Sequence, residues 1–162
     1  VDNESRLGAI ADVQFAIDQA GIADDCIVAA GDNIFRFDFE NLYHTFQTHD
    51  ADTIVVQELN DRERLKQRGV VSFDDNQKIT LFEEKPQQPQ STFVCPALYM
   101  HKQSTLPLYK AFLNDHTTAD APGHFISWLY QQIPVYAHIM SQPALDIGTL
   151  AVYNEIQKTY SI

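Results

Sequence analysis

Few residues of this sequence are cysteine or basic, and each shortage excludes a class of protein. Only Cys26 and Cys95 carry thiols, and both stand in apolar runs. This excludes a disulfide framework and predicts two buried thiols in a reducing cytoplasm. Lysine and arginine number 11 against 22 acidic residues, and the net charge of -11 argues against nucleic acid or anionic lipid as a partner.

Other absences narrow the chemistry. No apolar run reaches the length of a membrane span and no signal peptide is visible, so no membrane partner is expected. The sequence has no Gly-x-x-x-x-Gly-Lys loop and no Gly-x-Ser-x-Gly elbow, and its six histidines fall in no metal-ligand spacing. The acidic charge still allows a phosphate pocket, because a local cation or metal reverses the field inside a cleft.

Helix-like and strand-like segments alternate along the chain, which predicts one domain with an α/β fold. The apolar run at 26–30 is typical of a strand buried on both faces, and 70–73 with 79–82 reads as a hairpin. We expect a Rossmann-like, mixed, mostly parallel sheet flanked by helices, with the hairpin as an antiparallel insertion. Further strands are predicted at 53–56, 93–100 and 135–140, and helices at 8–20, 38–49, 104–113, 125–130 and 149–159.

Two aspartates stand where carboxylates could hold a metal. Asp32 follows the apolar run after Gly31, and Asp146 lies between apolar residues just before Gly148 and Thr149. A turn at Asp32 and a capped helix start at Thr149 would explain the same residues structurally. Because two carboxylates with phosphate co-ligands are a usual way to hold Mg²⁺, the pair also predicts a magnesium site, with both side chains at one edge of the sheet.

A charged segment, Glu83-Glu84-Lys85-Pro86, ends the second strand of the predicted hairpin. A glutamate can accept hydrogen bonds from two sugar hydroxyls, and a lysine can neutralise a phosphate. Strand alternation, however, points Glu84 and Lys85 to opposite faces, so both reach one ligand only if the strand ends or bends at Lys85 before Pro86. The alternative is a solvated, charged strand end.

Taken together, four short motifs resemble the sugar-1-phosphate nucleotidylyltransferases, especially the glucose-1-phosphate thymidylyltransferase-like branch. Their order and approximate spacing carry the resemblance, which extends over nearly the whole chain. The segment Arg6-Leu7-Gly8-Ala9-Ile10 also looks like the base-binding segment of that family. The four motifs are Ala30-Gly31-Asp32-Asn33-Ile34-Phe35, Gly69-Val70-Val71-Ser72-Phe73-Asp74, Glu83-Glu84-Lys85-Pro86 and Asp146-Ile147-Gly148-Thr149.

The resemblance implies a nucleotide-diphospho-sugar transferase type of fold and a reaction between a nucleoside triphosphate and a sugar-1-phosphate that gives an NDP-sugar and pyrophosphate. It implies dTTP or UTP with glucose-1-phosphate or a relative as substrates, and it is compatible with a homo-oligomer. Asp32 and Asp146 would be catalytic and hold Mg²⁺. Glu84 would bind sugar hydroxyls, Lys85 the sugar phosphate, Gly69 would offer its backbone to the sugar, and Gly8 would lie near the base.

The sequence departs from the family in two places. The glycine-rich N-terminal loop with an Arg and a following Lys, which cradles the triphosphate in the family, has no match here. We therefore expect residues 1–162 to form a single, N-terminally truncated nucleotidylyltransferase domain that is inactive alone. The alternative is a non-catalytic module that binds sugar phosphate or nucleotide. His124 and Ser127 also stand where many thymidylyl relatives carry acidic residues, which leaves the sugar and base open.

Overall fold

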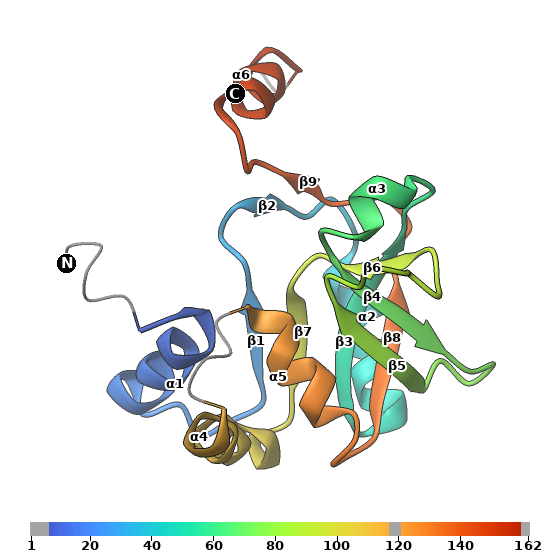
Figure 1. Cartoon of the computed structure of the whole chain (residues 1–162). Coiled ribbons are helices and arrows are strands. Elements are labelled where there is room, and N and C mark those ends of the chain that lie inside the picture. The colour runs from blue at the N-terminus through green and yellow to red at the C-terminus, as the bar shows by residue number, and fades with distance from the viewer. Residues whose placement is uncertain (1–6, 117–120, 160–162) are drawn as a thin grey trace.

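A mixed β-sheet carries helices on both of its faces, in a computed structural model that describes residues 7–116 and 121–159 (Figure 1). The elements are α1 (Ala9–Ala20), β1 (Cys26–Ala29), β2 (Asn33–Ile34), α2 (Phe39–His49), β3 (Asp52–Glu58), α3 (Arg62–Leu65), β4 (Gly69–Phe73), β5 (Ile79–Glu84), β6 (Phe93–Cys95), β7 (Leu98–His101), the 3₁₀ turn η2 (Gln103–Thr105), α4 (Leu106–Asp115), α5 (Pro122–Leu129), β8 (Val135–Ile139), β9 (Leu145–Asp146) and α6 (Leu150–Thr159). The predicted α/β class is confirmed.

The main sheet is organised around β3. Its strand order is β1–β7–β3–β6–β4–β5, with β8 paired to β3 outside that path, and β2 with β9 forms a separate two-stranded sheet. The expected hairpin is present as β4 and β5, which pair antiparallel with Gly69 opposite Glu84. The carboxyl end of β5 therefore lies beside the start of β4, which becomes important for the site.

The sheet is mixed, as predicted, but the expectation that it is mostly parallel is wrong for the described residues. Only β3 and β8 pair in parallel, over Asp52–Val56 and Val135–Ile139. The pairs β1–β7, β3–β7, β3–β6, β4–β6 and β4–β5 are antiparallel. The physical reason lies in the connections, because a parallel pair needs a long crossover whereas β4 and β5 are joined by a short turn.

The first strand is not buried on both faces as its apolar sequence predicted. Within the described residues β1 pairs only with β7 and ends the strand order. Its alternate residues are exposed, with Ile27 keeping 48% of its accessible surface, because one face of the strand is not covered. A continuous apolar run indicates burial but does not distinguish a central strand from an edge strand. Edge position is a property of pairing between distant segments and cannot be seen in the run itself.

The strand predicted over 93–100 is divided into β6 and β7. Pro96 cannot donate a ladder hydrogen bond, and Ala97 has φ 52°, in the left-handed region. The two parts have different partners in the sheet: β6 pairs with β3 and β4, whereas β7 pairs with β1 and β3.

Helix boundaries lie close to the predicted ones, with two differences in detail. On α2 only Leu42 and Phe46 are buried, whereas Phe39 and Tyr43, expected on the same face, are about half exposed. Thr105 precedes α4 as expected for a cap, but its hydroxyl donates to Asp52 at 2.9 Å and caps nothing. In α6 the expected cap is present, since the backbone N–H of Val152 donates to the Thr149 hydroxyl at 3.3 Å.

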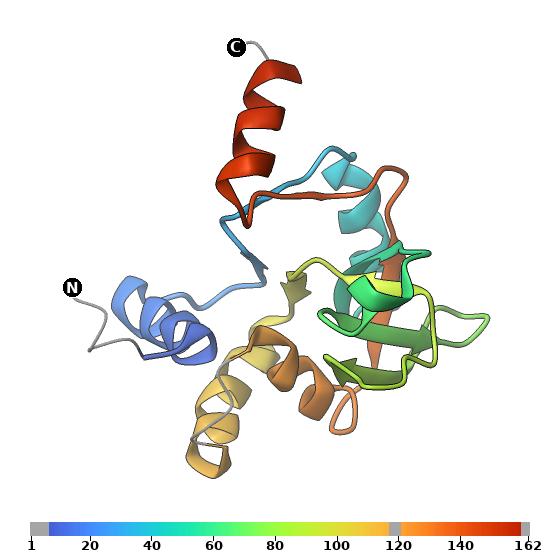
Figure 2. The same ribbon diagram turned by 45° about the horizontal axis from the view of Figure 1, so that its top comes forward.

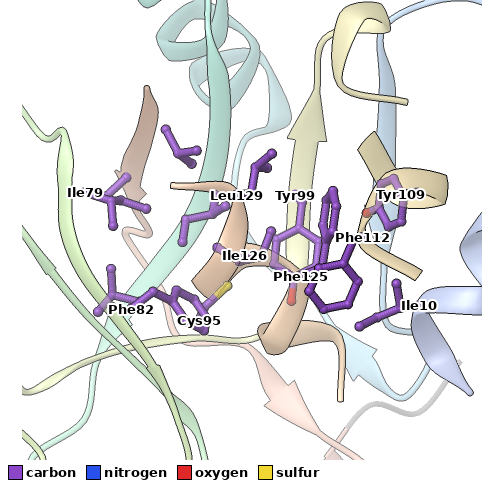
Figure 3. Packing of buried hydrophobic residues seen from close by; sticks show 14 of the residues in the cluster. Ile10, Ile79, Phe82, Cys95, Tyr99, Tyr109, Phe112, Phe125, Ile126 and Leu129 are labelled. Carbon is purple, nitrogen blue, oxygen red and sulfur yellow. The ribbon is translucent and has the colours of Figure 1, made fainter. Parts of the chain in front are cut away.

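Two apolar clusters cover the two faces of the sheet. The larger one packs α1, α4 and α5 on one face, through residues such as Ile10, Phe112 and Phe125 (Figure 3). The smaller one packs α2 on the other face through Leu42 and Phe46. In the described residues no helix is long and apolar enough to cross a membrane.

A polar network lies inside the larger cluster. The Asp52 carboxylate is 2.7 Å from Nδ1 of His101 and accepts hydrogen bonds from the Lys102 amide and the Thr105 hydroxyl, each at 2.9 Å. Nε2 of His101 is 3.0 Å from the hydroxyl of Tyr109. The ring of His101 also packs edge-on against the ring of Phe125, so the network contacts helix α5. His101 is thus a hydrogen-bonded core residue, as expected.

Candidate functional site

The two candidate metal ligands come from neighbouring backbone segments. Asp32 lies in the turn between β1 and β2, and its carbonyl accepts a hydrogen bond from the amide of Ile147 at 2.7 Å. Asn33 is the antiparallel partner of Asp146 in the β2–β9 pair. Figure 1 shows these two short strands side by side, away from the main sheet. We name this region, with Asp32, Asn33 and Asp146, the β2–β9 edge.

The two carboxylates have different partners within the described residues. Asp32 accepts a hydrogen bond from the side-chain amide of Asn33 at 2.8 Å and is exposed. Asp146 forms a short ion pair with the guanidinium of Arg68, and the two side chains keep 27% and 35% of their accessible surface. A Cβ at Gly148 would lie 3.1 Å from an Asp146 oxygen, so the glycine leaves space for this carboxylate.

Arg68 is a site residue that the sequence motifs did not indicate. It precedes Gly69 at the start of β4, and its carbonyl accepts a hydrogen bond from the amide of Lys85 at 3.0 Å. Arg68 therefore connects the end of β5, by its backbone, to Asp146, by its side chain. The only sequence signal for Arg68 was its position next to the Gly69 motif. Its partner, Asp146, is 78 residues away and could not be inferred from the sequence.

A cavity of about 490 Å³ opens beside this ion pair. Arg64 and Arg68 contribute positive charge to it, Asp146 contributes the carboxylate, and Val152 and Ile156 of α6 close one side. Neither Asp32 nor Glu84 nor Lys85 lines this cavity, so the structure does not gather every predicted residue into one hollow. Two arginines beside a carboxylate suit an anionic ligand that also brings a cation.

The end of β5 places Glu84 in a confined position. Its Cα is opposite Gly69, and one carboxylate oxygen lies 3.2 Å from the point where a Gly69 Cβ would stand. Burial raises the pKa of the Glu84 carboxyl, while Lys85 and His124 act in the opposite direction. Each carboxylate oxygen can accept hydrogen bonds from a ligand.

Lys85 does not continue the alternation of the strand. β5 ends at Glu84, and Lys85 has φ 50°, a left-handed conformation that is uncommon outside glycine. This left-handed turn meets the condition, stated from the sequence, that the strand must end or bend at Lys85 before Pro86. It removes the geometric objection to Glu84 and Lys85 acting on one ligand, since the two side chains no longer follow the two faces of an ideal strand.

A helix approaches the same carboxylate. The hydroxyl of Ser127 on α5 donates to the carbonyl of Phe82 at 2.9 Å, and Gly123 in the first turn of α5 lies against Glu84. We name the region formed by Gly69, Glu84 and Gly123 the β5–α5 corner. The sequence singled out Ser127 and His124 only as departures from the family, and it gave no sign that Gly123 matters.

The part of the predicted base-binding segment that the structure describes, from residue 7 to residue 10, lies at the start of α1. Gly8 is the N-cap with φ 90°, and its carbonyl accepts a hydrogen bond from the amide of Asp12 at 2.8 Å. A second cavity of about 380 Å³, mainly apolar, lies where Ala9 and Ile10 face Ala30 and Gly31. Arg6, which belongs to the same predicted segment, lies outside the described residues.

Other chemistries find little support in the described residues. No group of three or more His, Cys, Asp or Glu side chains there could hold a metal. Burial raises the pKa of the Cys95 thiol to about 12, which keeps it protonated and poorly nucleophilic. Both Cys26 and Cys95 are free thiols, as expected, although Cys26 is only half-buried. A metal here would need the two aspartates together with oxygens of a ligand.

Sequence comparison supplies the family. A family model described as nucleotidyl transferase matches residues 3–161. A glucose-1-phosphate adenylyltransferase of Lachnospira eligens is 27% identical over 130 residues, which are 80% of this chain and 31% of that protein. A valienol-1-phosphate guanylyltransferase of Streptomyces hygroscopicus subsp. limoneus is 30% identical over 87 residues, which are 54% of this chain and 23% of that protein. The chain thus spans less than a third of these relatives.

Structural comparison agrees on the fold. An apo UDP-glucose pyrophosphorylase superposes with a TM-score of 0.82 at 13% identity, covering 99% of this chain and 62% of its own. A Bacillus anthracis crystal structure, assigned as a glucose-1-phosphate thymidylyltransferase and solved with a sucrose, gives a TM-score of 0.76 at 19% identity, covering 96% of this chain and 61% of its own.

Proposed function

The chain belongs to the nucleotidyl transferase family, and from that premise we propose that it carries the sugar-phosphate half of an enzyme that transfers a nucleotidyl group to a sugar-1-phosphate. In this reaction an oxygen of the sugar phosphate attacks the α-phosphorus of a nucleoside triphosphate, and pyrophosphate leaves in line. No covalent bond to the protein is needed, so positioning and charge neutralisation supply the catalysis.

One observation carries the proposal. Arg68 connects the two groups of predicted residues, because its carbonyl binds the backbone of Lys85 and its guanidinium binds the carboxylate of Asp146. Arg68 therefore bridges the Glu-Glu-Lys-Pro motif, proposed to bind the sugar phosphate, and Asp146, proposed to bind the metal. Lys85 and Asp146 are about 60 residues apart in sequence. An enzyme that joins a sugar phosphate to a metal-bound triphosphate needs this adjacency.

The oxygen donors at the β2–β9 edge fit Mg²⁺. Asp32 and Asp146 bring two carboxylates to adjoining backbone segments, and hard oxygen ligands with substrate phosphates are what this ion prefers. When bound, Mg²⁺ would supply charge neutralisation at the phosphates. Asp146 would exchange its ion pair with Arg68 for the metal, which frees the guanidinium to bind a phosphoryl oxygen.

The sugar phosphate is assigned to the end of β5. The partly buried Glu84 carboxylate accepts hydrogen bonds from two sugar hydroxyls, and the backbone of Gly69, opposite Glu84, is assigned to contact the ring. Lys85, turned out of the strand by its left-handed backbone, binds the phosphate. We assign the base to the first turn of α1 at Gly8, beside the apolar cavity under Ala30 and Gly31.

The substrates themselves are the finer part of the proposal. The resemblance of the motifs favours dTTP or UTP with glucose-1-phosphate, whereas the curated relatives described above are named as adenylyl- and guanylyltransferases. Glucose-1-phosphate is common to the sequence expectation and to the name of the adenylyltransferase relative, so it is the probe we choose. The base is best decided by offering ATP, GTP, dTTP and UTP in parallel.

The first test asks whether the chain binds the sugar phosphate through Glu84. Calorimetric titration of the 162-residue chain with glucose-1-phosphate should show binding, weakened about 10- to 100-fold by Glu84→Ala, because charge-assisted hydrogen bonds are lost. We expect no pyrophosphate release, because these residues contain no glycine-rich loop to hold a triphosphate. Absence of binding would sink the sugar assignment. Rapid turnover by the chain alone would contradict the expected need for that loop.

A second candidate, a non-catalytic module, predicts the same binding but no contribution to catalysis. A longer protein that contains these residues and turns over should lose turnover on Asp146→Asn while still binding glucose-1-phosphate. Equal turnover of wild type and Asp146→Asn would favour the module, because only the enzyme reading gives Asp146 a role in the chemical step.

A further inference from the structure

Helix α5 lies in register along the last residues of β5. Ser127 donates to the carbonyl of Phe82, and one helical turn earlier Gly123 faces Glu84, two residues further along the strand. Four helical residues advance about 6 Å, and two strand residues advance roughly 6.6 Å, so the two contacts match. The hydrogen bond at Ser127 and the contact at Gly123 are therefore two separate points along the same helix–strand pair.

At Gly123 there is no room for any side chain. An added Cβ would stand 1.8 Å from one carboxylate oxygen of Glu84, 2.9 Å from its carboxyl carbon and 3.0 Å from the ring of Phe82. The same oxygen lies 3.2 Å from the position of an added Cβ at Gly69. The carboxylate thus lies close to two backbone positions that lack side chains.

Helix formation does not explain this glycine. Glycine in a helix is less favourable than alanine by about 1 kcal/mol, and both glycines flanking the carboxylate are buried. Gly123 has a negative φ, so a left-handed backbone does not require it either. The close approach of the carboxylate is the remaining physical reason for a residue without Cβ at this position.

We propose that Gly123 is a positioning residue for the sugar: its lack of a side chain leaves the Glu84 carboxylate a fixed, partly dehydrated place from which it can accept hydrogen bonds from the ligand. The inference rests on the proposed sugar-binding role of Glu84. A fixed acceptor has already lost its rotamer freedom, so binding hydroxyls has less entropy to overcome. Any side chain at 123 displaces the acceptor without removing it.

The substitution Gly123→Ala is a useful probe because the severe contact is with the end of a flexible side chain, whereas the buried Phe82 ring, at 3.0 Å, needs to shift only slightly. The Glu84 carboxylate can swing away while α5 stays in place, so the fold should be retained. The shorter Glu84→Asp side chain should not reach the added methyl group. The two changes should therefore be coupled, and a double-mutant cycle measures that coupling.

The experiment compares glucose-1-phosphate affinity by calorimetry in the wild type, Gly123→Ala, Glu84→Asp and the double variant. We expect Gly123→Ala to weaken binding about tenfold or more with Glu84 present, and by less than about twofold in the Glu84→Asp background. Ser127→Ala is the matched control, because it loosens α5 without adding atoms near Glu84, and it should leave the affinity within about twofold. Equal losses in both backgrounds, or an equal loss from Ser127→Ala, would overturn the inference.

A second readout needs no ligand. The pKa of Glu84, followed by carboxyl ¹³C NMR, should fall toward its ordinary value of 4.5 in Gly123→Ala, because the displaced carboxylate becomes hydrated. An unchanged pKa would overturn the inference even if no sugar phosphate bound. Loss of affinity in Gly123→Ala together with unchanged affinity in Glu84→Ala would instead count against the sugar role of Glu84.

Discussion

The β5–α5 corner and the β2–β9 edge both present carboxylates, but the fold holds them in different ways. In the corner, Glu84 is partly buried between glycine backbones, and α5 above it belongs to the main core. At the edge, each strand has two residues, and no described residue of α6, which follows β9, is buried (Figure 2). Asp146 is held by one partly exposed ion pair.

This difference matches what the proposed ligands need. Hydroxyls of a neutral sugar ring are distinguished by acceptors at fixed positions, which a packed corner provides. A metal ion with bound phosphates draws its ligands into place when it binds, so the carboxylates that hold it do not need a tightly packed segment beforehand. The comparison predicts that substitutions in the corner act on folding and on sugar binding, whereas substitutions at the edge act on charge.

The largest effect should come from the polar network under the corner. Asp52→Ala leaves buried partners of three hydrogen bonds unsatisfied, and we expect a loss of about 3–5 kcal/mol in the free energy of unfolding, measured in urea. Hydrogen exchange should quicken in α5 and leave the β2–β9 amides unchanged. Equal quickening in both regions would show that the edge also rests on this network.

The two glycines of the corner should respond differently. Gly69→Ala places a Cβ 2.7 Å from the buried ring of Phe82, and overpacking of this kind costs about 1–3 kcal/mol. Gly123→Ala meets a movable carboxylate and should change the unfolding free energy by less than about 1 kcal/mol. Chemical denaturation of both variants checks this order, and a larger loss at Gly123 would contradict the comparison.

At the edge, Arg68→Gln should barely change stability, because a partly exposed ion pair contributes about 0–1 kcal/mol. It should instead raise the affinity for Mn²⁺ by roughly fivefold or less, since Asp146 loses a competing cation. Arg64→Gln is the matched control, as it removes a charge from the same cavity without touching the ion pair. Equal gains from both variants would mean that only the general field changed.

The smallest effect concerns the acidity of Glu84, whose pKa is raised by burial above the ordinary 4.5. Below that value both folded and unfolded chains hold the proton. As pH rises, the unfolded chain ionises first, so the folded state loses stability until the pH passes its own higher pKa. Glu84→Gln should therefore be more stable than wild type at neutral pH and equal to it near pH 3. A gain that persists at low pH would point to another cause.

Local signals in the sequence were sufficient for much of the fold and pointed to a bend near Lys85. Helical spacing placed the helix α2 but only half of its buried face, because Leu42 and Phe46 are buried and Phe39 and Tyr43 are not. The residues between Phe73 and Ile79 marked the hairpin turn. Pro86 made an end of the strand near Lys85 plausible, and β5 ends at Glu84. Each of these depends on neighbours in sequence, which is why it could be read.

What could not be predicted depends on contacts between distant segments. The exposure of β1 depends on which distant segments pack around the strand. The Thr105 hydroxyl donates to the buried Asp52 instead of capping α4. Arg68 finds Asp146 78 residues away, and Gly123 became significant only when α5 was placed against β5. In each case a residue type was visible, but the partner that gives it a role was not.

The central claim is that the corner binds the sugar and the edge binds the metal of one reaction. Diffraction from crystals of the chain grown with glucose-1-phosphate and Mn²⁺ tests it most directly, because manganese is located by its anomalous signal. We predict manganese at Asp32 and Asp146, the sugar hydroxyls on Glu84, and the phosphate between Lys85 and the metal. Manganese elsewhere, or a sugar that leaves the Glu84 carboxylate uncontacted, would contradict the account.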